Sequence, residues 1–385
     1  MTNRYFETVL LRENRGPVSW AIRALCWPLS IAYRAGLRAY LALYRLGLRK
    51  RCRLDAPVIS VGNLTFGGTG KTPAVQTLCR MLTEQGKRVA VLSRGHGGSA
   101  RGVIVASDGE RILSDSVECG DEPILLARTL PGVPVIVGKN RRRSGKLACE
   151  RFAPDVIVLD DGMQYWQLAR DLDIAVLDAA KPFGSGFVMP MGDLREPISG
   201  LNRAGIVLLA NARGIDETQY GALADRIAKL APDAAVYRCA REPVCFRSAD
   251  SGEEVDPAWV KRRRVLAFCG IGRPLSFLEM LDGLGAAVAG SIVFPDHYRL
   301  SGRDMARIIE KAQACGAEAI VTTEKDIARL DTPCRGNADP AQHSIPNLYA
   351  LVIKLEIEDS ASFAQHITNR IDRQDRQAPA QKAPD

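Results

Sequence analysis

Residues 58–86 combine a short apolar strand, a glycine-rich loop and a helix in immediate succession. The strand covers Val58–Val61, the loop runs from Gly62 to Gly70, and a helical pattern continues over Thr72–Gly86. In this arrangement the backbone N–H groups of the loop surround phosphate groups at the positive end of the helix dipole. The stretch therefore predicts a P-loop, and with it a site for a nucleoside triphosphate.

The end of the loop carries the side chains that phosphate and metal binding require. Lys71 would neutralise the β- and γ-phosphates, and the Thr72 hydroxyl would bind Mg²⁺. Thr65 stands where the strict pattern G-x-x-x-x-G-K-[ST] has its first glycine, so the glycines that follow would provide the backbone freedom. The alternative interpretation is a glycine-rich turn followed by an unrelated lysine. We expect the nucleotide to be bound by Thr65, Gly67, Gly68, Thr69, Gly70, Lys71 and Thr72.

Two adjacent carboxylates follow another apolar run. Val156–Leu159 is succeeded by Asp160 and Asp161, as expected where a second strand ends beside a P-loop. Carboxylate oxygens are the ligands that Mg²⁺ prefers, usually together with several waters. The pair therefore predicts the protein part of a magnesium site, in which either aspartate can be the ligand. The alternative is an acidic turn.

Short apolar runs alternate with helical segments through most of the chain. The runs predicted as strands are 58–61, 89–93, 133–137, 156–159, 174–177 and 206–209, then 265–269, 287–294, 319–323 and 348–357. Such runs, separated by crossover helices, are typical of a mostly parallel sheet in an α/β fold. We predict a P-loop NTPase-like core over 54–255, a smaller second α/β domain over 256–369 and a disordered tail over 370–385.

The N-terminal segment, residues 1–53, is basic and apolar at the same time. It carries eleven Arg or Lys residues and only two Glu residues, so it accounts for the net charge of +8. Trp, Tyr and Leu residues lie between arginines at helical spacing, and the longest charge-free run is well short of the roughly 20 residues of a bilayer span. The segment predicts an amphipathic helix on an anionic membrane surface. The alternative is a helix packed on the protein's own core.

Composition argues against several other classes of protein. Ten cysteines occur without any Cys-x-x-Cys pair, and there are only four histidines, which disfavours a structural zinc site or a disulfide framework. A basic N-terminus and the run of arginines 141–143 would also suit a nucleic-acid-binding ATPase. However, the long apolar side chains between the N-terminal arginines favour a bilayer over a phosphate backbone, so we expect no nucleic-acid partner.

Eight short motifs occur in order: VGNLTFGGTGKTP (61–73), SRGHGG (93–98), GDEP (120–123), VLDDGMQ (158–164), LREP (194–197), GIGRP (270–274), FPDHY (294–298) and VTTEKD (321–326). Together they closely resemble the tetraacyldisaccharide 4'-kinase family, the lipid A 4'-kinases of Gram-negative bacteria. The resemblance implies ATP- and Mg²⁺-dependent phosphorylation of the 4'-hydroxyl of a tetraacylated glucosamine disaccharide 1-phosphate. It also implies a location at the cytoplasmic face of the inner membrane, and we expect a monomer.

The resemblance implies catalytic residues outside the P-loop. Asp121 in GDEP is similar to the family's catalytic aspartate, and His297 in FPDHY to its partner histidine. A carboxylate can accept the proton of a sugar hydroxyl, and a histidine bonded to that carboxylate can orient it. Taken alone, Asp121 could equally be a helix N-cap before Pro123, and His297 a structural histidine.

Arg195 and Glu196 in LREP resemble further active-site residues. Arg195 would stabilise phosphoryl charge and Glu196 would complete the magnesium or substrate site, with a surface ion pair as the alternative. Asn63, Gln164 and the segment 324–326 are additional candidates without a specific role. The chain departs from the resemblance at His96 in SRGHGG, where many members of the family have tyrosine.

A membrane-associated P-loop ATPase that acts as a regulatory or partitioning switch is the competing interpretation of the loop. Proteins of that kind carry a lysine immediately before the glycine pair, where this chain has Phe66. Transfer of phosphate to a lipid acceptor would exclude the switch.

Overall fold

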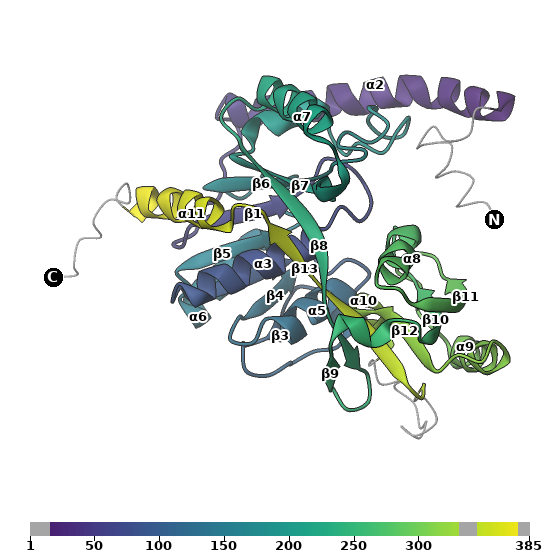
Figure 1. Ribbon diagram of the computed structural model, residues 1–385. Coiled ribbons are helices and arrows are strands. Elements are labelled where there is room, and N and C mark those ends of the chain that lie inside the picture. Colours follow the sequence, from purple (N-terminus) through teal and green to yellow (C-terminus); the bar gives the residue numbers. More distant parts are fainter. Residues whose placement is uncertain (1–15, 331–344, 376–385) are drawn as a thin grey trace. The chain divides into compact units, whose positions relative to one another are not determined.

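The computed structural model describes residues 16–330 and 345–375, which form two compact units. Among these residues the first unit consists of 16–90, 145–240 and 356–375, and the second of 91–144, 241–330 and 345–355. Both contain helices and mostly parallel strands (Figure 1). The predicted α/β class with a mostly parallel sheet is therefore confirmed, whereas the predicted domain boundaries stay predictions.

Parts of the predicted terminal segments lie outside the described residues, namely 1–15 and 376–385. The first six residues of the predicted disordered tail, 370–375, belong instead to helix α11 (Ser360–Asp375). The apolar residues of that helix, Phe363, Ile367 and Ile371, are buried at helical spacing. Burial of one face therefore keeps this stretch helical despite its polar sequence.

The strands of the first unit form a parallel sheet in the order β5 (Val156–Asp160), β1 (Val58–Gly62), β6 (Leu172–Asp178), β7 (Ile206–Ala210) and β8 (Ala235–Ser248). Every residue of β1, β5, β6 and β7 is buried. Burial on both faces explains why these strands consist of nearly continuous Val, Ile and Leu runs. Because β1 lies between β5 and β6, the loops at its carboxyl end and at the end of β5 are neighbours.

Several helices accompany this sheet. Helix α3 (Lys71–Glu84) packs against β1 and β5, and its buried residues recur at helical spacing (Figure 1). Helix α7 (Glu217–Leu230) is capped by Asp216, whose side chain accepts a hydrogen bond from the backbone N–H of Gln219. The arginine run 141–143 is the start of helix α6 (Arg141–Phe152), and Arg141 is buried. Arg142 and Arg143 are exposed, so only the first side chain of the run is buried.

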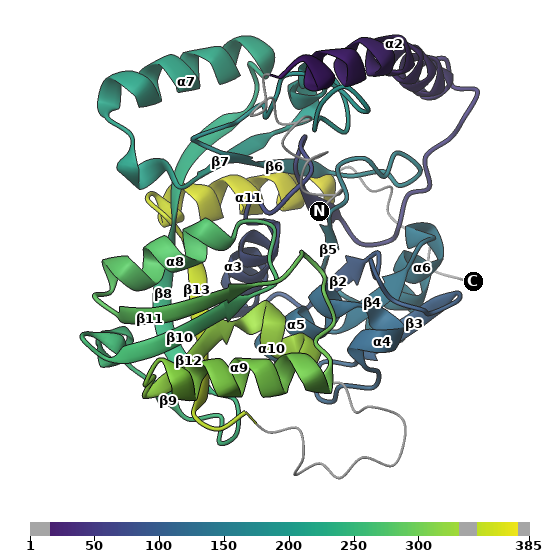
Figure 2. The ribbon, with the colours of Figure 1, turned by 90° about the vertical axis from the view of Figure 1, so that its right-hand side faces the viewer.

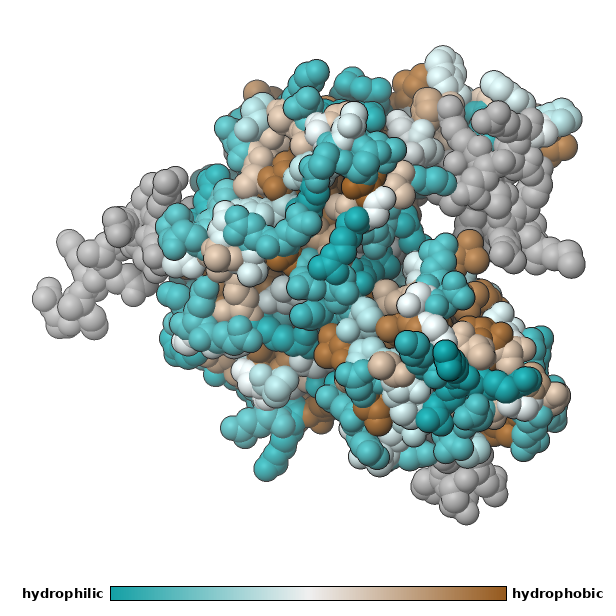
Figure 3. Space-filling view, in the orientation of Figure 1, coloured by the Kyte–Doolittle hydropathy of each residue, from teal (hydrophilic) through white to brown (hydrophobic). Residues whose placement is uncertain are grey.

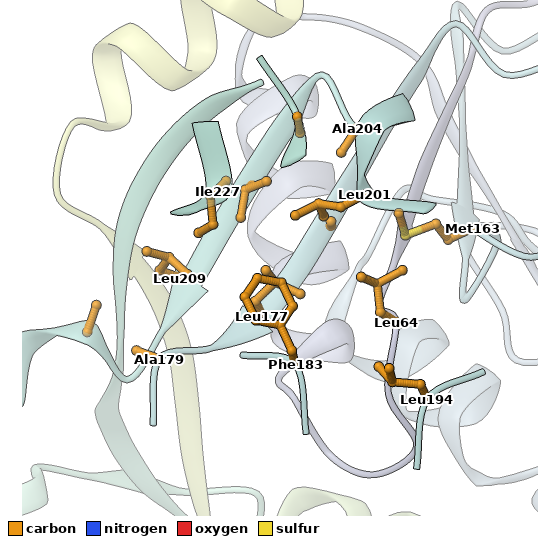
Figure 4. Packing of buried hydrophobic residues seen from close by; sticks show 14 of the residues in the cluster. Leu64, Met163, Leu177, Ala179, Phe183, Leu194, Leu201, Ala204, Leu209 and Ile227 are labelled. Atoms are coloured by element: carbon orange, nitrogen blue, oxygen red, sulfur yellow. The ribbon is translucent and has the colours of Figure 1, made fainter. Parts of the chain in front are cut away.

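A cluster of buried apolar side chains connects three of the sequence motifs. Leu64, Met163 and Leu194 all belong to it, and they come from VGNLTFGGTGKTP, VLDDGMQ and LREP respectively (Figure 4). Fully burying a side chain of this size contributes roughly 1.5–3 kcal/mol. Each motif thus has one apolar anchor in a common core, and the polar residues next to the anchors are held in fixed positions.

The second unit contains two groups of strands. In one group β2 (Val89–Ser93) pairs in parallel with β4 (Val135–Gly138), and β4 pairs with the antiparallel strand β3 (Val103–Ser107). In the other group the parallel order is β11 (Ala287–Val293), β10 (Arg264–Cys269), β12 (Ala319–Thr323) and β13 (Leu348–Ile357). The helices are α4 (Ser116–Cys119), α5 (Asp121–Thr129), α8 (Pro274–Gly283), α9 (Gly302–Ala314) and α10 (Glu324–Leu330).

Strand β10 shows how the second group is covered. Val265, Ala267 and Cys269 pack with α8. Leu266 and Phe268, which point to the other face, pack with α9 (Figure 2). Alternation along the strand therefore places one helix on each face. The short helix α5 packs against α10, which brings together two segments that lie far apart in the sequence.

Each run predicted as a strand overlaps a strand of the structure, but three strands of the described residues were not predicted: β3, β8 and the two-residue strand that pairs with β8. Strand β3 is an antiparallel edge strand, and β8 extends into the polar region after residue 240. Its charges are paired: Arg238 lies 2.6 Å from Glu217, and Arg247 lies 2.8 Å from Glu254 of the short strand β9 (Glu254–Val255). Because these ion pairs allow charged residues in a strand, its sequence lacks the usual apolar pattern.

Helix α2 (Pro17–Arg45) belongs to the first unit and carries a row of exposed apolar side chains. Trp20, Leu25 and Trp27 are 67%, 74% and 56% exposed, and hydrophobic side chains are visible along α2 in Figure 3. Its opposite side contacts the unit through Ser30, which donates to the carbonyl of Val188 at 2.9 Å. Within the part of the chain that the structure describes, we find no helix long and apolar enough to cross a membrane.

Candidate active site

The P-loop begins directly after β1 and is held by the buried side chain of Asn63. Its Nδ2 atom donates to the Thr69 hydroxyl at 3.0 Å, and its Oδ1 atom accepts from Lys71 Nζ at 3.4 Å. Asn63 therefore connects the first and last parts of the loop. The sequence named Asn63 only as a candidate without a role, and the structure shows that it fixes the shape of the loop.

The backbone of the loop is open toward a ligand at its glycines. Gly67 and Gly70 have φ values of +102° and +98°, which favour glycine. A Cβ atom added at Gly67 or Gly68 would contact no atom of the described residues within 4 Å. Gly70 is the N-cap of α3, so Lys71 and Thr72 are its first two helical residues, at the end of the helix that favours anions.

The two aspartates after β5 have different surroundings. Asp160 is 2% exposed and lies beside Val61 of β1 in the parallel register. Asp161 follows with a φ of +49°. Its carboxylate lies 3.7 Å from Lys71 Nζ, and both of its oxygens lie 2.7 Å from Arg195 Nη1. The acidic pair at the end of β5 therefore lies beside the P-loop, with Asp161 next to Lys71.

The LREP motif lies against the P-loop rather than at the surface. The backbone N–H of Arg195 donates to the carbonyl of Leu64 at 2.8 Å, and the Tyr33 hydroxyl of α2 donates to the carbonyl of Arg195 at 2.7 Å. Glu196 is 2% exposed and accepts hydrogen bonds from Arg203 at 2.6 and 2.8 Å. A surface ion pair, the alternative interpretation of this motif, is therefore wrong.

Gln164 links these elements. Its Nε2 atom donates to the carbonyl of Asn63 at 2.9 Å and to Oε1 of Glu196 at 2.7 Å. Both carboxylate oxygens of Glu196 thus already accept bonds from Arg203 or Gln164. Arg203 and Gln164 therefore hold Glu196 in place, whereas the guanidinium group of Arg195 contacts Asp161.

The donor set at the end of β1 and β5 fits a magnesium ion. Thr72, Asp160 and Asp161 offer only oxygen atoms, and Mg²⁺ in kinases is commonly held by one or two protein oxygens together with phosphates and waters. Among residues 16–330 and 345–375, no group of three or more His, Cys, Asp or Glu side chains is arranged to hold a metal.

The second unit holds the two remaining predicted catalytic residues, Asp121 at the start of α5 and His297 in the loop after β11. The N-cap of α5 is Gly120, and Asp121 is its first helical residue without a capping bond from its side chain. The N-cap interpretation of Asp121 is therefore wrong. Gly120 has a φ of +87°, and a Cβ atom there would lie 2.4 Å from the carbonyl oxygen of His96, so the GDEP and SRGHGG motifs pack directly against each other through glycine.

Asp121 and His297 are brought together across 176 residues of sequence, with His297 Nδ1 3.4 Å from Asp121 Oδ2. His297 has a φ of +58°, an uncommon backbone conformation for histidine. The neighbouring Phe294 anchors this loop by stacking on Tyr298 at a centroid distance of 5.2 Å. The rings of His96 and His297 meet edge to face with their centroids 5.4 Å apart, so the residue that departs from the family resemblance contacts the predicted partner histidine.

Sequence reasoning did not identify Arg329, which also contacts Asp121. Its Nε atom donates to Asp121 Oδ2 at 2.7 Å. Burial raises the pKa of the Asp121 carboxyl, but the hydrogen bond with His297 and the ion pair with Arg329 outweigh burial, so its pKa lies below the ordinary value. The sequence did contain a signal for Arg329: it lies three residues after Asp326, the last residue of VTTEKD, and residues three apart on a helix share a face.

The features at the end of β1 and β5 define the class of the protein. A strand–loop–helix phosphate site with an adjacent lysine, a helix-terminal threonine and strand-end carboxylates is the arrangement of P-loop phosphotransferases. The family model described as Tetraacyldisaccharide-1-P 4'-kinase matches residues 22–372. The chain therefore belongs to the tetraacyldisaccharide 4'-kinase family and is a kinase, as the order of its motifs indicated.

Individual relatives agree with this assignment. A tetraacyldisaccharide 4'-kinase of Anaeromyxobacter sp. (strain K) is 42% identical over 325 residues, which cover 84% of this chain and 86% of the relative. One of Syntrophus aciditrophicus (strain SB) is 40% identical over 328 residues, covering 83% and 86%. The crystal structure of LpxK from Aquifex aeolicus in complex with ATP is similar with a TM-score of 0.72 and 30% identity, covering 91% of this chain and 99% of that one.

Proposed function

We propose that this kinase transfers the γ-phosphoryl group of ATP to the 4'-hydroxyl of a tetraacylated glucosamine disaccharide 1-phosphate, a step of lipid A biosynthesis. The observation that carries the proposal is the carboxylate of Asp121, which His297 and Arg329 contact within a chain of this family. A sugar hydroxyl is a weak nucleophile, and a carboxylate acceptor for its proton is what such a transfer needs.

The P-loop would bind the triphosphate of ATP. Backbone N–H groups at the glycines and the N-terminus of α3 favour phosphate oxygens, and Lys71 neutralises their charge. Arg195, already within 2.7 Å of Asp161, would add a second positive charge. Thr72, Asp160 and Asp161 would hold Mg²⁺, which when bound neutralises the charge of the phosphates. Glu196, held by Arg203 and Gln164, would complete the magnesium or substrate site.

Asp121 would act as the general base for the acceptor. Its depressed pKa keeps the carboxylate ionised at neutral pH, which is the form that accepts a proton. His297 would orient the carboxylate from the loop after β11. Both roles were expected from the family resemblance, and the contacts within the second unit support them.

The exposed apolar face of α2 would attach the protein to the cytoplasmic face of the inner membrane as a monomer. Trp20, Leu25 and Trp27 are exposed, and aromatic side chains of this kind favour the membrane interface. Replacing all three by Gln should release the protein from anionic vesicles at low salt, because the apolar contribution is lost. Replacing the similarly exposed Leu275 of α8 is the control. Sedimentation of the triple variant with the vesicles as completely as the parent would contradict this attachment.

The decisive experiment is a kinase assay with the purified full-length chain, [γ-³²P]ATP, Mg²⁺ and the disaccharide 1-phosphate in detergent. We expect a lipid product phosphorylated at the 4'-position, and a loss of about a hundredfold or more in turnover for Asp121→Ala. ATP hydrolysis without a phosphorylated lipid would overturn the proposal in favour of a nucleotide switch.

A further inference from the structure

We infer that Arg329, held in place by Asp326, is a positioning residue that fixes the carboxylate of Asp121 and leaves its Oδ1 atom as the oxygen that accepts the proton. The inference rests on the proposed function and assigns a role to two residues outside the P-loop and the Asp121–His297 pair. All of its observations come from the second unit.

Arg329 is a buried cation whose donors point to three different groups. Its side chain is 2% exposed; Nε donates to Asp121 Oδ2 at 2.7 Å, and Nη1 donates to the carbonyl of Gly270 at 2.6 Å and to Asp326 Oδ1 at 2.9 Å. Because the guanidinium group is planar and rigid, the two bonds from Nη1 fix the direction in which Nε points at Asp121. A mobile lysine could neutralise Asp121, but it could not define its orientation in this way.

Asp326 is in turn fixed by two other elements. Its Oδ1 accepts from the backbone N–H of Gly270 at 3.1 Å, and its Oδ2 accepts from the Thr323 hydroxyl at 2.6 Å. Burial raises the pKa of Asp326, whereas the guanidinium of Arg329 and these donors favour its charged form. The motifs GIGRP and VTTEKD therefore meet at this ion pair, and the function proposed above gave neither of them a role.

The contacts of Asp121 are asymmetric. Both His297 Nδ1 and Arg329 Nε contact Oδ2, and among the described residues Oδ1 of Asp121 accepts no hydrogen bond. Two donors on Oδ2 prevent rotation of the carboxylate and satisfy that oxygen. Oδ1 is thus the atom that remains to accept a proton from a hydroxyl group.

Other charged groups also surround this carboxylate and enter its titration. Glu122 follows Asp121 on α5 and lies 3.2 Å from Lys325 of α10; Asp296 lies 3.6 Å from Lys325, 3.7 Å from Arg329 and 3.8 Å from His297. His96 contacts the ring of His297. Arg329 is the cation with a direct bond to Asp121, so its removal should have the largest effect of these groups.

The test compares Arg329→Gln, Arg329→Lys and Asp326→Asn in the full-length enzyme, with kcat and kcat/KM for the lipid acceptor measured from about pH 4 to pH 9. The acidic limb of kcat/KM reports the base of the free enzyme. Without the cation, the pKa of Asp121 rises, so the limb of Arg329→Gln should move to higher pH by about one to three units. Arg329→Lys should recover most of this shift, because it keeps the charge.

The value of kcat at pH values above the acidic limb distinguishes the orientation of the Asp121 carboxylate from its basicity. A more basic carboxylate would by itself favour proton acceptance, so a fall of kcat by about tenfold or more in Arg329→Gln reports lost orientation. Asp326→Asn removes the anchor but keeps the guanidinium. We therefore expect a lower kcat without an upward shift of the acidic limb, and an unchanged KM for ATP in all three variants.

Arg247→Gln is the matched control, because Arg247 also contacts two carboxylates of this unit, Glu254 and Glu324, but not Asp121. It should leave the acidic limb in place. The inference is overturned if the limb of Arg329→Gln stays at the wild-type position, or if Arg247→Gln shifts it equally. If Arg329→Gln does not fold, as circular dichroism would show, Arg329→Lys and Asp326→Asn decide through their kcat. A wild-type enzyme without lipid product would instead refute the proposed function.

Discussion

The Nζ atom of Lys71 lies 3.7 Å from Oδ1 of Asp161, while Arg195 contacts both oxygens of the same carboxylate at 2.7 Å. One carboxylate thus gathers the two cations that we propose to act on phosphate. Asp161 directly follows the last residue of β5, and its backbone adopts a φ of +49°. The relationship connects the P-loop, the end of β5 and the LREP motif.

Replacing Lys71 by Ala should reduce kcat/KM for ATP by about a hundredfold or more, because the charge that neutralises the phosphates is lost. The fold should persist, since Arg195 still pairs with Asp161. Lys87→Ala, after the other end of α3, is the control and should retain full activity. Phosphotransfer by Lys71→Ala at the parent rate would contradict the role of the loop.

Replacing Asp160 by Asn should raise the Mg²⁺ concentration needed for half-maximal activity by about tenfold or more, because a carboxylate is a far better ligand of this ion than an amide. The measurement is initial rate against free Mg²⁺ at saturating ATP. Asp155→Asn, just before the other end of β5, removes a carboxylate paired with Arg88 and should leave the requirement unchanged. An equal requirement in Asp160→Asn and the parent would remove Asp160 from the metal site.

Replacing His297 by Gln should move the acidic limb of kcat/KM to higher pH. Bonding by His297 helps to keep the pKa of Asp121 below its ordinary value, despite the opposing effect of burial. Activity requires the ionised carboxylate, so it is present above this pKa and is lost as the pH falls through it. With the pKa raised, the loss occurs at higher pH. His366→Gln on α11 is the control, and coincident limbs for all three proteins would argue against the contact.

Replacing Leu64 by Ala should lower the free energy of unfolding of the first unit by about 2–5 kcal/mol, because it opens a cavity in the cluster shared by three motifs. Denaturant unfolding monitored by tryptophan fluorescence measures the loss. Leu209→Ala of β7, in the same cluster, should be similarly destabilising. Only Leu64→Ala should also weaken ATP binding, since Leu64 lies between Asn63 and Thr65 of the loop. Equal ATP affinities of the two variants would show that the anchor does not shape the loop.

Sequence patterns predicted the local elements well. Strand β1, the glycine loop and α3 follow from a continuous apolar run, from glycines and from helical periodicity, all within residues 58–84. The same holds for β5 and its two aspartates. Predictions failed where a contact distant in sequence stabilises a polar segment. Strand β8 was not predicted, because its arginines form ion pairs with Glu217 and Glu254. The tail was predicted to be disordered from residue 370, but α11 continues to Asp375 because Ile371 is buried.

The family resemblance supplied Asp121 and His297, but not how they are held. The bonds of Asp121 to His297 and Arg329 span 176 and 208 residues. Likewise, only the structure showed that Glu196 is bonded by Arg203 and that Asn63 bridges the loop.

The sequence by itself thus determined the α/β class, the phosphate-binding loop and the identity of the family, because each depends on short-range periodicity or on motifs of adjacent residues. The tertiary structure decided which cation faces which carboxylate, and that His297 and Arg329 both contact Oδ2 of Asp121. Those contacts depend on how strands pair and how α5 packs against α10. Spacing along the chain does not encode a pairing between residues about two hundred positions apart, since it results from burial of many apolar side chains at once.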